Sequence, residues 1–160
     1  MKITIQLHNQ TLRLVDGDKQ KTLAHYSISS AEKGPGQLKN SFCTPTGKHI
    51  IRAKIGQGAS AGSVFVGRRP TGEIYNEQLR RDHPNRDWIL TRILWLSGLE
   101  LGHNRLGQHD SMQRYIYIHG TPDDQPMGIP KSHGCIRMRN LDIIELFDLV
   151  PVYTPVDIQL

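Results

Sequence analysis

Two histidines and a cysteine stand close together near the end of the chain, with glycines beside them. His119 follows the run Tyr-Ile-Tyr-Ile and precedes Gly120, and residues Ser132–Arg137 read Ser-His-Gly-Cys-Ile-Arg. A cysteine becomes a useful nucleophile when an adjacent imidazole lowers its pKa, and a neighbouring glycine lets a substrate carbonyl approach the backbone. The residues therefore predict a thiol nucleophile site, with Cys135 as the nucleophile and His119 as its base.

Two other kinds of site remain open for the same residues. His119, His133 and Cys135 are residue types that hold zinc with one position left open. A zinc hydrolase would also need an acidic general base, which the motif itself lacks. A non-catalytic binding module would need a cleft but no thiol. With a thiol nucleophile as the preferred interpretation, we expect no metal and no other cofactor.

Composition limits the class of protein. The chain has 160 residues, 37% of them hydrophobic, with 15 glycines and 9 prolines, which suits one folded domain over residues 1–160. The net charge of +5, from 20 Lys and Arg less 15 Asp and Glu, is spread along the chain. No nucleic-acid-binding motif accompanies this charge, so nucleic acid is not an expected partner. No apolar run approaches the roughly 18 residues of a membrane helix, so no membrane association is expected.

The N-terminus and the two cysteines bear on the compartment. Residues 1–8 alternate apolar and polar side chains, whereas a secretion signal needs an unbroken apolar run of about 7–15 residues. Cys43 and Cys135 neither require nor exclude an oxidising compartment, but a nucleophilic Cys135 must stay reduced, so we expect no disulfide. A cytoplasmic protein is the resulting prediction.

Short strands dominate the first half of the chain. The apolar residues of 3–7 and of 12–14 alternate with polar ones across a turn at Asn9–Gln10, which predicts an opening β-hairpin. The polar segment Gly72–Arg86 suits a surface loop or a short helix. Further strand-like runs occupy Thr22–Ser29, Lys48–Ile55 and Ser63–Gly67.

The second half adds strands and one helix. Asn140 is a suitable helix cap, and apolar residues at helical spacing run from there to Leu149 before Pro151 ends the helix. Strands are expected at Arg114–His119 and Val156–Leu160, and at Trp88–Leu96, whose length alone does not exclude a helix. Because long helices do not separate the strands, the pattern predicts a mainly β single domain, a sandwich or barrel with one or two short helices, and not a doubly wound parallel sheet.

The motif around Cys135 resembles the signature of the YkuD-type L,D-transpeptidases, which is a His, a loop, and then Ser/Thr-His-Gly-Cys and an apolar residue. In this chain the elements are His119-Gly120-Thr121, a loop that contains Met127-Gly128-Ile129-Pro130, and Ser132–Met138. Thr44-Pro45-Thr46-Gly47 and Pro155-Val156 resemble the upstream turn and the closing strand of that family. The loop of twelve residues from Gly120 to Lys131 is short for the family, and no peptidoglycan-binding module accompanies the domain.

The resemblance implies a role for each motif residue. Cys135 would be the nucleophile, His119 its base, and the Gly120 carbonyl the acceptor that orients the His119 ring. His133 would support the site and the substrate. The amides of Gly134 and Cys135 would form an oxyanion hole, in which the loss of one donor typically costs about 3–4 kcal/mol.

Further residues are expected to bind the substrate. Arg137 stands where some family members carry Asn, and its planar guanidinium suits a substrate carboxylate; Ser132 and Tyr117 are the other two candidates. If residues 135–137 are extended, Arg137 points the same way as the thiol. By alternation Tyr115 and Tyr117 face the side of His119, as a cleft wall or as ordinary core.

Several residues carry weaker expectations. His103 and Arg105 either line the cleft or lie outside it, and Cys43 is a bystander. Five further histidines are expected at the surface or in packing: His8, His25, His49, His83 and His109.

The resemblance also implies a reaction. Secreted members of the family cross-link cell-wall peptides by passing an acyl group from the cysteine to an amine. A member without a secretion signal resembles the L,D-carboxypeptidases of murein recycling, in which water replaces the amine and releases the terminal D-alanine of a stem tetrapeptide. An L,D-transpeptidase that forms cross-links or exchanges D-amino acids is the alternative, because acylation is identical in both. The expected partners are peptidoglycan stem peptides or muropeptides.

Overall fold

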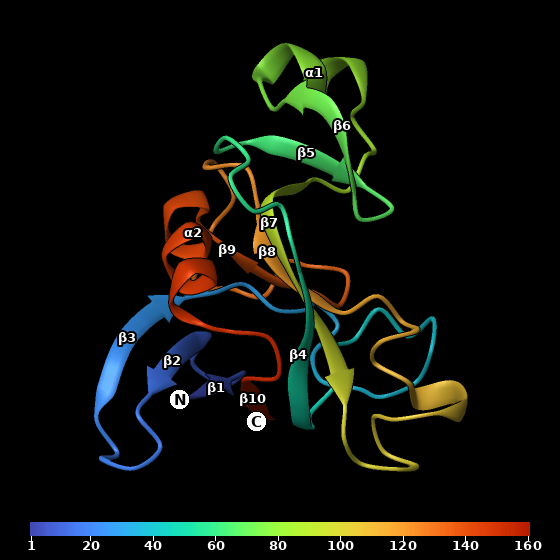
Figure 1. Cartoon of the computed structure of the whole chain (residues 1–160). Coiled ribbons are helices and arrows are strands. Elements are labelled where there is room, and N and C mark those ends of the chain that lie inside the picture. Colours follow the sequence, from blue (N-terminus) through green and yellow to red (C-terminus); the bar gives the residue numbers. More distant parts are fainter.

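A single ten-stranded mixed sheet organises the protein (Figure 1), whose computed structural model describes residues 1–160. The strand order is β3-β2-β1-β10-β4-β7-β5-β6, and β8 pairs with β7 and with β9. The helices are α1 (Glu77–Asp82) and α2 (Asn140–Leu149), with a 3-10 turn at Gly107–His109. The strands are β1 (Lys2–Gln6), β2 (Thr11–Val15), β3 (Thr22–Ser27), β4 (Gly47–Ile55), β5 (Ser63–Val66), β6 (Arg69–Ile74), β7 (Ile89–Gly98), β8 (Tyr117–Gly120), β9 (Ile136–Met138) and β10 (Pro155–Gln159). Neither helix combines the length and apolar character needed to span a membrane.

The sheet curls into a half-barrel that encloses the main core. β1 pairs with β2 as the antiparallel hairpin and with β10 in parallel, which places the two chain ends side by side. At the far end of the sheet an isolated antiparallel bridge joins Ser29, just beyond β3, to Arg137 of β9. This bridge holds the edge strand β9 against the N-terminal part of the chain.

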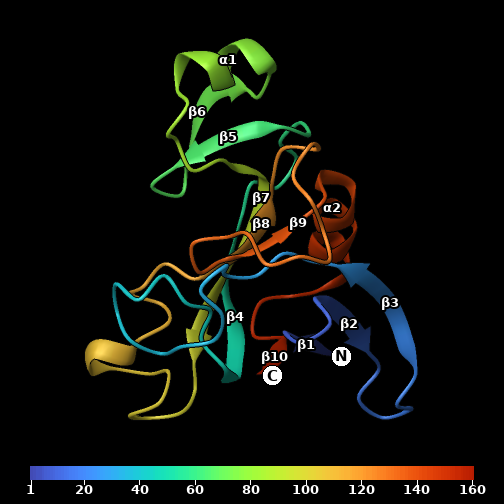
Figure 2. The same ribbon diagram turned by 180° about the vertical axis from the view of Figure 1, so that it is seen from behind.

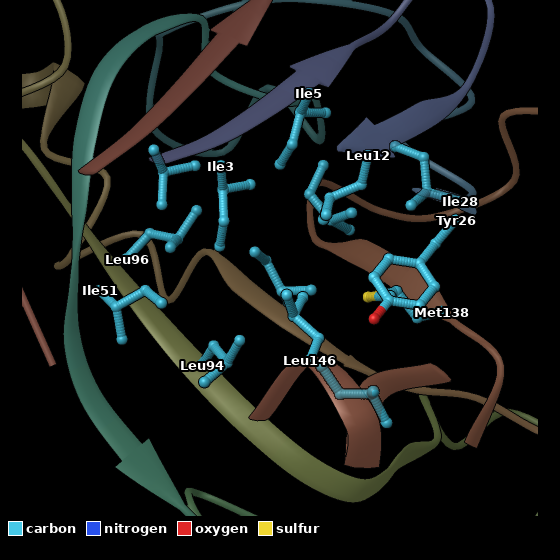
Figure 3. Packing of buried hydrophobic residues seen from close by; sticks show 14 of the residues in the cluster. Ile3, Ile5, Leu12, Tyr26, Ile28, Ile51, Leu94, Leu96, Met138 and Leu146 are labelled. Carbon is cyan, nitrogen blue, oxygen red and sulfur yellow. The ribbon is translucent and has the colours of Figure 1, made fainter. Parts of the chain in front are cut away.

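Helix α2 fills the open side of the half-barrel. Its residues Ile143, Leu146 and Phe147 are fully buried and meet the inward side chains of β1, β2, β4 and β7 in a cluster of 20 residues (Figure 3). Full burial of one such large apolar side chain stabilises the fold by about 1.5–3 kcal/mol. The core therefore fixes β8 and β9, since Ile118 and Ile136 belong to the same cluster.

Residues 56–88, which we call the flap, stand apart from the half-barrel (Figures 1 and 2). The flap consists of the β5–β6 hairpin and α1, and it packs on β7 through two small apolar clusters centred on Trp88 and on Phe65. Three side-chain pairs tie it to the half-barrel: Arg68 with Tyr117, Arg80 with Asp124, and Asp87 with Arg137. Thr91 and Arg92 of β7 also bond to the flap backbone at Gly62 and Ala59.

The mainly β fold predicted from the sequence is confirmed, as are the opening hairpin and the end of α2 at Leu149. Strand β6 was missed, because Arg69–Ile74 is almost wholly exposed and lacks an apolar alternation. Strand β8 begins only at Tyr117, since Tyr115 lies in the preceding turn with φ +57°. Asn140 is the first residue of α2 and does not cap it; the cap is Arg139, which makes no side-chain capping bond.

Candidate active site

Parallel strands β8 and β9 bring the two halves of the motif together. His119 pairs with Arg137 and Ile118 with Ile136. Because both isoleucines are fully buried in the main core, and side chains alternate along a strand, His119 and Arg137 point to the opposite face. Cys135, two residues before Arg137, lies on that face too. The intervening loop contains three prolines, and it returns the chain so that β9 runs parallel to β8.

The His119 ring is held in one orientation. Its Nδ1 lies 2.6 Å from the Gly120 carbonyl oxygen, and since a carbonyl only accepts, Nδ1 carries the proton and Nε2 is free to act as a base. Burial lowers the pKa of His119 below its ordinary value, although the charge of Asp87 and the bond to Gly120 oppose the shift. His119 is therefore a neutral imidazole near pH 7.

Gly120 has a packing role that the sequence did not reveal. It is the last residue of β8 and not a turn residue. A Cβ at this position would lie 2.6 Å from the Leu90 carbonyl oxygen and 2.6 Å from Asn140 Oδ1. Only a glycine lets β8 approach β7 and α2 this closely, and the same residue supplies the acceptor for His119.

The Cys135 thiol is half-buried and is not yet engaged with His119. It donates a hydrogen bond to the Tyr115 carbonyl at 3.3 Å and accepts one from the Tyr117 amide at 3.4 Å. Burial, with a smaller contribution from Asp87, raises the pKa of Cys135 to about 12, against the opposing effects of the Tyr117 amide and nearby arginines. The sequence-based expectation of a lowered thiol pKa is therefore wrong for this resting structure, because desolvation outweighs every partner that would stabilise a thiolate.

Burial thus keeps both groups neutral at rest. It lowers the pKa of His119 and raises that of Cys135, so a thiolate–imidazolium pair is disfavoured on both sides. A neutral thiol can still attack a carbonyl if the imidazole takes its proton as the C–S bond forms. The arrangement points to a proton transfer coupled to attack.

The turn that precedes Cys135 is fastened at several points. Gly134 has φ +132°, a conformation that side-chain-bearing residues rarely adopt. Its carbonyl accepts a hydrogen bond from Thr44 Oγ1 at 2.9 Å, and its amide donates to Ser132 Oγ at 3.2 Å. Ser132 Oγ in turn donates to the Cys135 carbonyl at 2.5 Å. Ser132 is buried, so its hydroxyl holds the turn in place and is not open to a substrate.

These bonds leave one free donor beside the thiol. The amide of Cys135 makes no hydrogen bond within the protein, so it is available to an oxyanion. The amide of Gly134 is engaged by Ser132, and it would have to be shared to become a second donor. The expected oxyanion hole has one donor ready in this structure.

Arg137 lines a polar cavity of about 340 Å³, which His133 also lines and Cys135 does not. Its guanidinium donates to the Lys131 carbonyl at 3.1 Å and pairs with Asp87 at 3.3 Å. Asp87 is therefore bound to the guanidinium that was expected, from the sequence, to bind a substrate carboxylate. A second hollow of about 190 Å³ lies on the Tyr115 side and is also lined by His133, so His133 stands between two openings.

The comparison with family models decides the classification. The model described as the L,D-transpeptidase catalytic domain, YkuD, matches residues 1–158. The chain belongs to this family.

Curated relatives support this classification over shorter stretches. This chain is 51% identical over 43 residues to "Probable L,D-transpeptidase YbiS" of Escherichia coli (strain K12), a match that covers 27% of this chain and 14% of that protein. It is 53% identical over 45 residues to "Probable L,D-transpeptidase ErfK/SrfK" of Salmonella typhimurium, which covers 28% and 15%.

Solved structures share the fold. An L,D-transpeptidase of Enterococcus faecium aligns over 98% of this chain and 48% of its own, with 17% identity and a TM-score of 0.58. One from Mycobacterium smegmatis aligns over 99% and 58%, with 17% identity and a TM-score of 0.55. The YkuD domain thus spans about half the length of these solved chains and a much smaller part of the curated relatives.

The flap closes one side of the YkuD site. Arg68, at the tip of the β5–β6 hairpin, donates to the Tyr117 hydroxyl at 3.0 Å and lies 4.7 Å from the ring centroids of Trp95 and Tyr115. Tyr117 is only 4% exposed and packs with Phe65. Tyr117 therefore anchors the flap and lines neither hollow beside Cys135, so direct contact with substrate is not supported by this geometry.

The remaining candidate residues lie elsewhere. His103 contacts Thr46 at 3.2 Å, and neither it nor Arg105 lines either hollow beside Cys135. The zinc alternative lacks a ligand set, because no group of three or more His, Cys, Asp or Glu side chains is arranged to hold a metal. Cys43 is half-buried, and its carbonyl accepts from Arg114 at 2.7 Å. Of the other histidines only His49 is fully buried.

Sequence reasoning missed four residues that shape the site. Asp87 and Arg68 lie in the flap, and no local pattern shows that the flap folds against Cys135. Thr44 was noted within a turn motif but not as the residue that fixes Gly134. Arg114 donates to four acceptors in the segment 36–43 and so positions the loop beside Cys135. The sequence signal that could have revealed this role was the position of Arg114, an isolated arginine just before the strand that bears His119.

Proposed function

We propose that this chain is a cysteine acyltransferase that takes its acyl group from peptidoglycan stem peptides. The observation that carries the proposal is the β8–β9 pair, which places a free imidazole base, a thiol and an unbonded amide on one face of the sheet. This set of groups supports acyl transfer through a thioester. Membership of the L,D-transpeptidase family supports the stem peptide as the substrate.

The first half of the reaction follows from the geometry. The thiol turns from the Tyr115 carbonyl towards His119, and its sulfur attacks the carbonyl carbon of the residue before the terminal D-alanine. Nε2 of His119 takes the thiol proton as the C–S bond forms, and the Cys135 amide donates to the oxyanion. When the intermediate collapses, the C–N bond breaks and His119 passes the proton to the leaving amine. D-alanine departs and a thioester remains on Cys135.

For the second half we propose hydrolysis, which makes the protein an L,D-carboxypeptidase. The cavity beside Arg137, about 340 Å³, is at the small end of the range for ligand sites. A space of this size has room for side groups of the donor peptide and a water, and leaves little for a second stem peptide. Water would lose a proton to His119 and attack the thioester. The C–S bond then breaks, Cys135 takes the proton from His119, and a tripeptide is released. A cytoplasmic location, where murein fragments are recycled, is part of the proposal.

One assay separates the outcomes. Purified protein is incubated with a diaminopimelate tetrapeptide, with and without a D-amino acid, and the products are weighed by mass spectrometry. Tripeptide and free D-alanine are expected, and Cys135→Ala should form neither. Cys43→Ser is the matched control, since it removes the other thiol and should keep full activity. Cross-linked dimers formed faster than tripeptide would replace this proposal with the transpeptidase.

The compartment needs its own measurement. Fractionation of the producing cells, with detection of the native protein by antibody, is expected to recover it with cytoplasmic markers. Recovery outside the cell membrane would favour cross-linking over recycling.

A further inference from the structure

The cavity beside Arg137, about 340 Å³, is unusually rich in arginine. Arg80 of α1, Arg86 of the segment after α1, and Arg137 of β9 all line it, and Asp87 is the one carboxylate among the lining residues. These three cations are brought together from the flap and from the half-barrel. The lining therefore brings three guanidinium groups and one carboxylate together.

Each of these arginines keeps unused donors. Arg80 pairs with Asp124, Arg86 with Glu73 at 2.9 Å, and Arg137 with Asp87. In each pair one guanidinium nitrogen meets one carboxylate oxygen, whereas a guanidinium carries five N–H donors in a planar fork. The Arg86 guanidinium also lies 4.9 Å from the Trp88 ring centroid, which helps to fix its plane.

The cavity borders the segment that bears the nucleophile, although neither Cys135 nor His119 lines it, and its Arg137 is the strand partner of His119. Its lining includes His133 and Arg137, which stand two residues before and two residues after the nucleophile Cys135. A peptide whose scissile carbonyl reaches the thiol would bring its neighbouring groups into this space. Bidentate carboxylate binding is what a guanidinium fork does best.

We propose that this cavity is a carboxylate-binding subsite, in which Arg80 and Arg86 of the flap act with Arg137 as specificity-determining residues for an acyl-donor peptide that carries several carboxylates. The proposal rests on the acyl-transfer function proposed above and adds the part of the protein that selects the donor. In the resting structure Arg137 is paired with Asp87, and a substrate carboxylate takes the place of Asp87 in this pair. The flap is then part of the substrate site as well as a cover.

The test measures how binding depends on the carboxylates of the peptide. The probes are the diaminopimelate tetrapeptide and an analogue whose carboxylates, other than the C-terminal one, are amidated. Arg80→Gln and Arg86→Gln should each weaken binding of the carboxylate peptide by about ten- to one-hundredfold, as expected for loss of a charged hydrogen bond. Binding of the amidated peptide should change less than threefold. The same variants should raise KM and leave kcat nearly unchanged.

Matched controls separate substrate binding from a purely structural latch. Asp124→Asn and Glu73→Gln break the same ion pairs from the other side but keep both cations in the cavity. Arg81→Gln makes the same charge change on a neighbouring exposed residue, which pairs with Glu77 and donates to Gln78. All three controls should bind the carboxylate peptide as the parent protein does. If Asp124→Asn matches Arg80→Gln, or if both peptides lose affinity equally, the arginines are a latch and the proposal falls.

Affinities are measured by calorimetry in the Cys135→Ala background, so that binding does not depend on turnover. Arginine-dependent binding without turnover in the parent protein would overturn the acyl-transfer function and leave the subsite standing. Turnover that is unchanged in the Arg80 and Arg86 variants would overturn the subsite and leave the acyl-transfer function standing. Absence of any binding would overturn the subsite itself.

Discussion

The resting state of the Cys135 thiol gives the sharpest test of the site. Burial raises its pKa from an ordinary value of 9.0 to about 12. This change disfavours the thiolate in the folded protein by about 4 kcal/mol. At pH 8 the thiolate fraction is then about one in ten thousand. This thiolate fraction is about a thousandfold lower than that of an ordinary thiol. Because the Cys135 thiolate is more basic, each thiolate reacts about 16- to 32-fold faster, which offsets part of the difference. Native Cys135 should therefore react with iodoacetamide about 30- to 60-fold more slowly than the same residue in the unfolded chain.

The assay uses Cys43→Ser, so that Cys135 is the sole thiol. Alkylation is followed by mass spectrometry from pH 6 to pH 10, once in buffer and once in urea. The native rate should rise about tenfold per pH unit across the whole range, while the rate of the unfolded chain levels off near its ordinary pKa. His119→Ala should leave the native slope unchanged, because no thiolate–imidazolium pair exists for it to break.

A different profile would refute the reasoning. If the native rate is already high at pH 6–7, and this rate is lost in His119→Ala, then His119 and Cys135 form an ion pair at rest. The desolvation argument would then be wrong, and attack would start from a preformed thiolate. A native plateau below pH 9 would lead to the same conclusion.

Other residues yield predictions of the same kind. Burial lowers the pKa of His49 from 6.5 to about 4. As the pH falls, His49 therefore becomes protonated in the unfolded chain before it does in the folded protein. About 3 kcal/mol of the free energy of unfolding should be lost as the pH falls from 6.5 towards 4, and His49→Gln should flatten this dependence in urea titrations. Gly120→Ala forces a Cβ against Asn140 and should cost about 1–3 kcal/mol of stability together with most of kcat; unchanged kcat would separate Gly120 from the orientation of His119. Arg68→Ala removes the flap contact to Tyr117 and should speed amide exchange over residues 63–74, whereas equal exchange in both proteins would show that the apolar clusters alone hold the flap.

Local pattern was enough for much of the scaffold. Alternating apolar residues in β1 and β2, and the helical spacing of Ile143 and Phe147, are signals that depend only on which face is buried. Both survive in the structure as core positions. The motif around Cys135 likewise identified the residues that the β8–β9 pair brings together, because a short loop leaves few ways to arrange them.

What the sequence did not reveal depends on contacts between distant segments. The exposed strand β6 is held by its pairing with β5, not by its own apolar pattern. The ion pair of Asp87 with Arg137 joins residues 50 positions apart, and the bond from Thr44 to Gly134 joins residues 90 apart. The thiol pKa was misjudged for a related reason. Burial is a property of the whole fold, and its effect exceeded that of the imidazole partner that the motif supplies.

The same desolvation that makes Cys135 a poor nucleophile at rest determines where its reactivity must come from. A buried thiolate is costly, but the negative charge need not rest on sulfur if it passes at once to a carbonyl oxygen. That oxygen meets the unbonded amide of Cys135, which is aimed by the φ of +132° at Gly134 and by the tether from Thr44. Donors fixed in advance in a poorly hydrated site stabilise such a charge more than water does. The rate should therefore depend as much on this turn as on the pKa of the thiol.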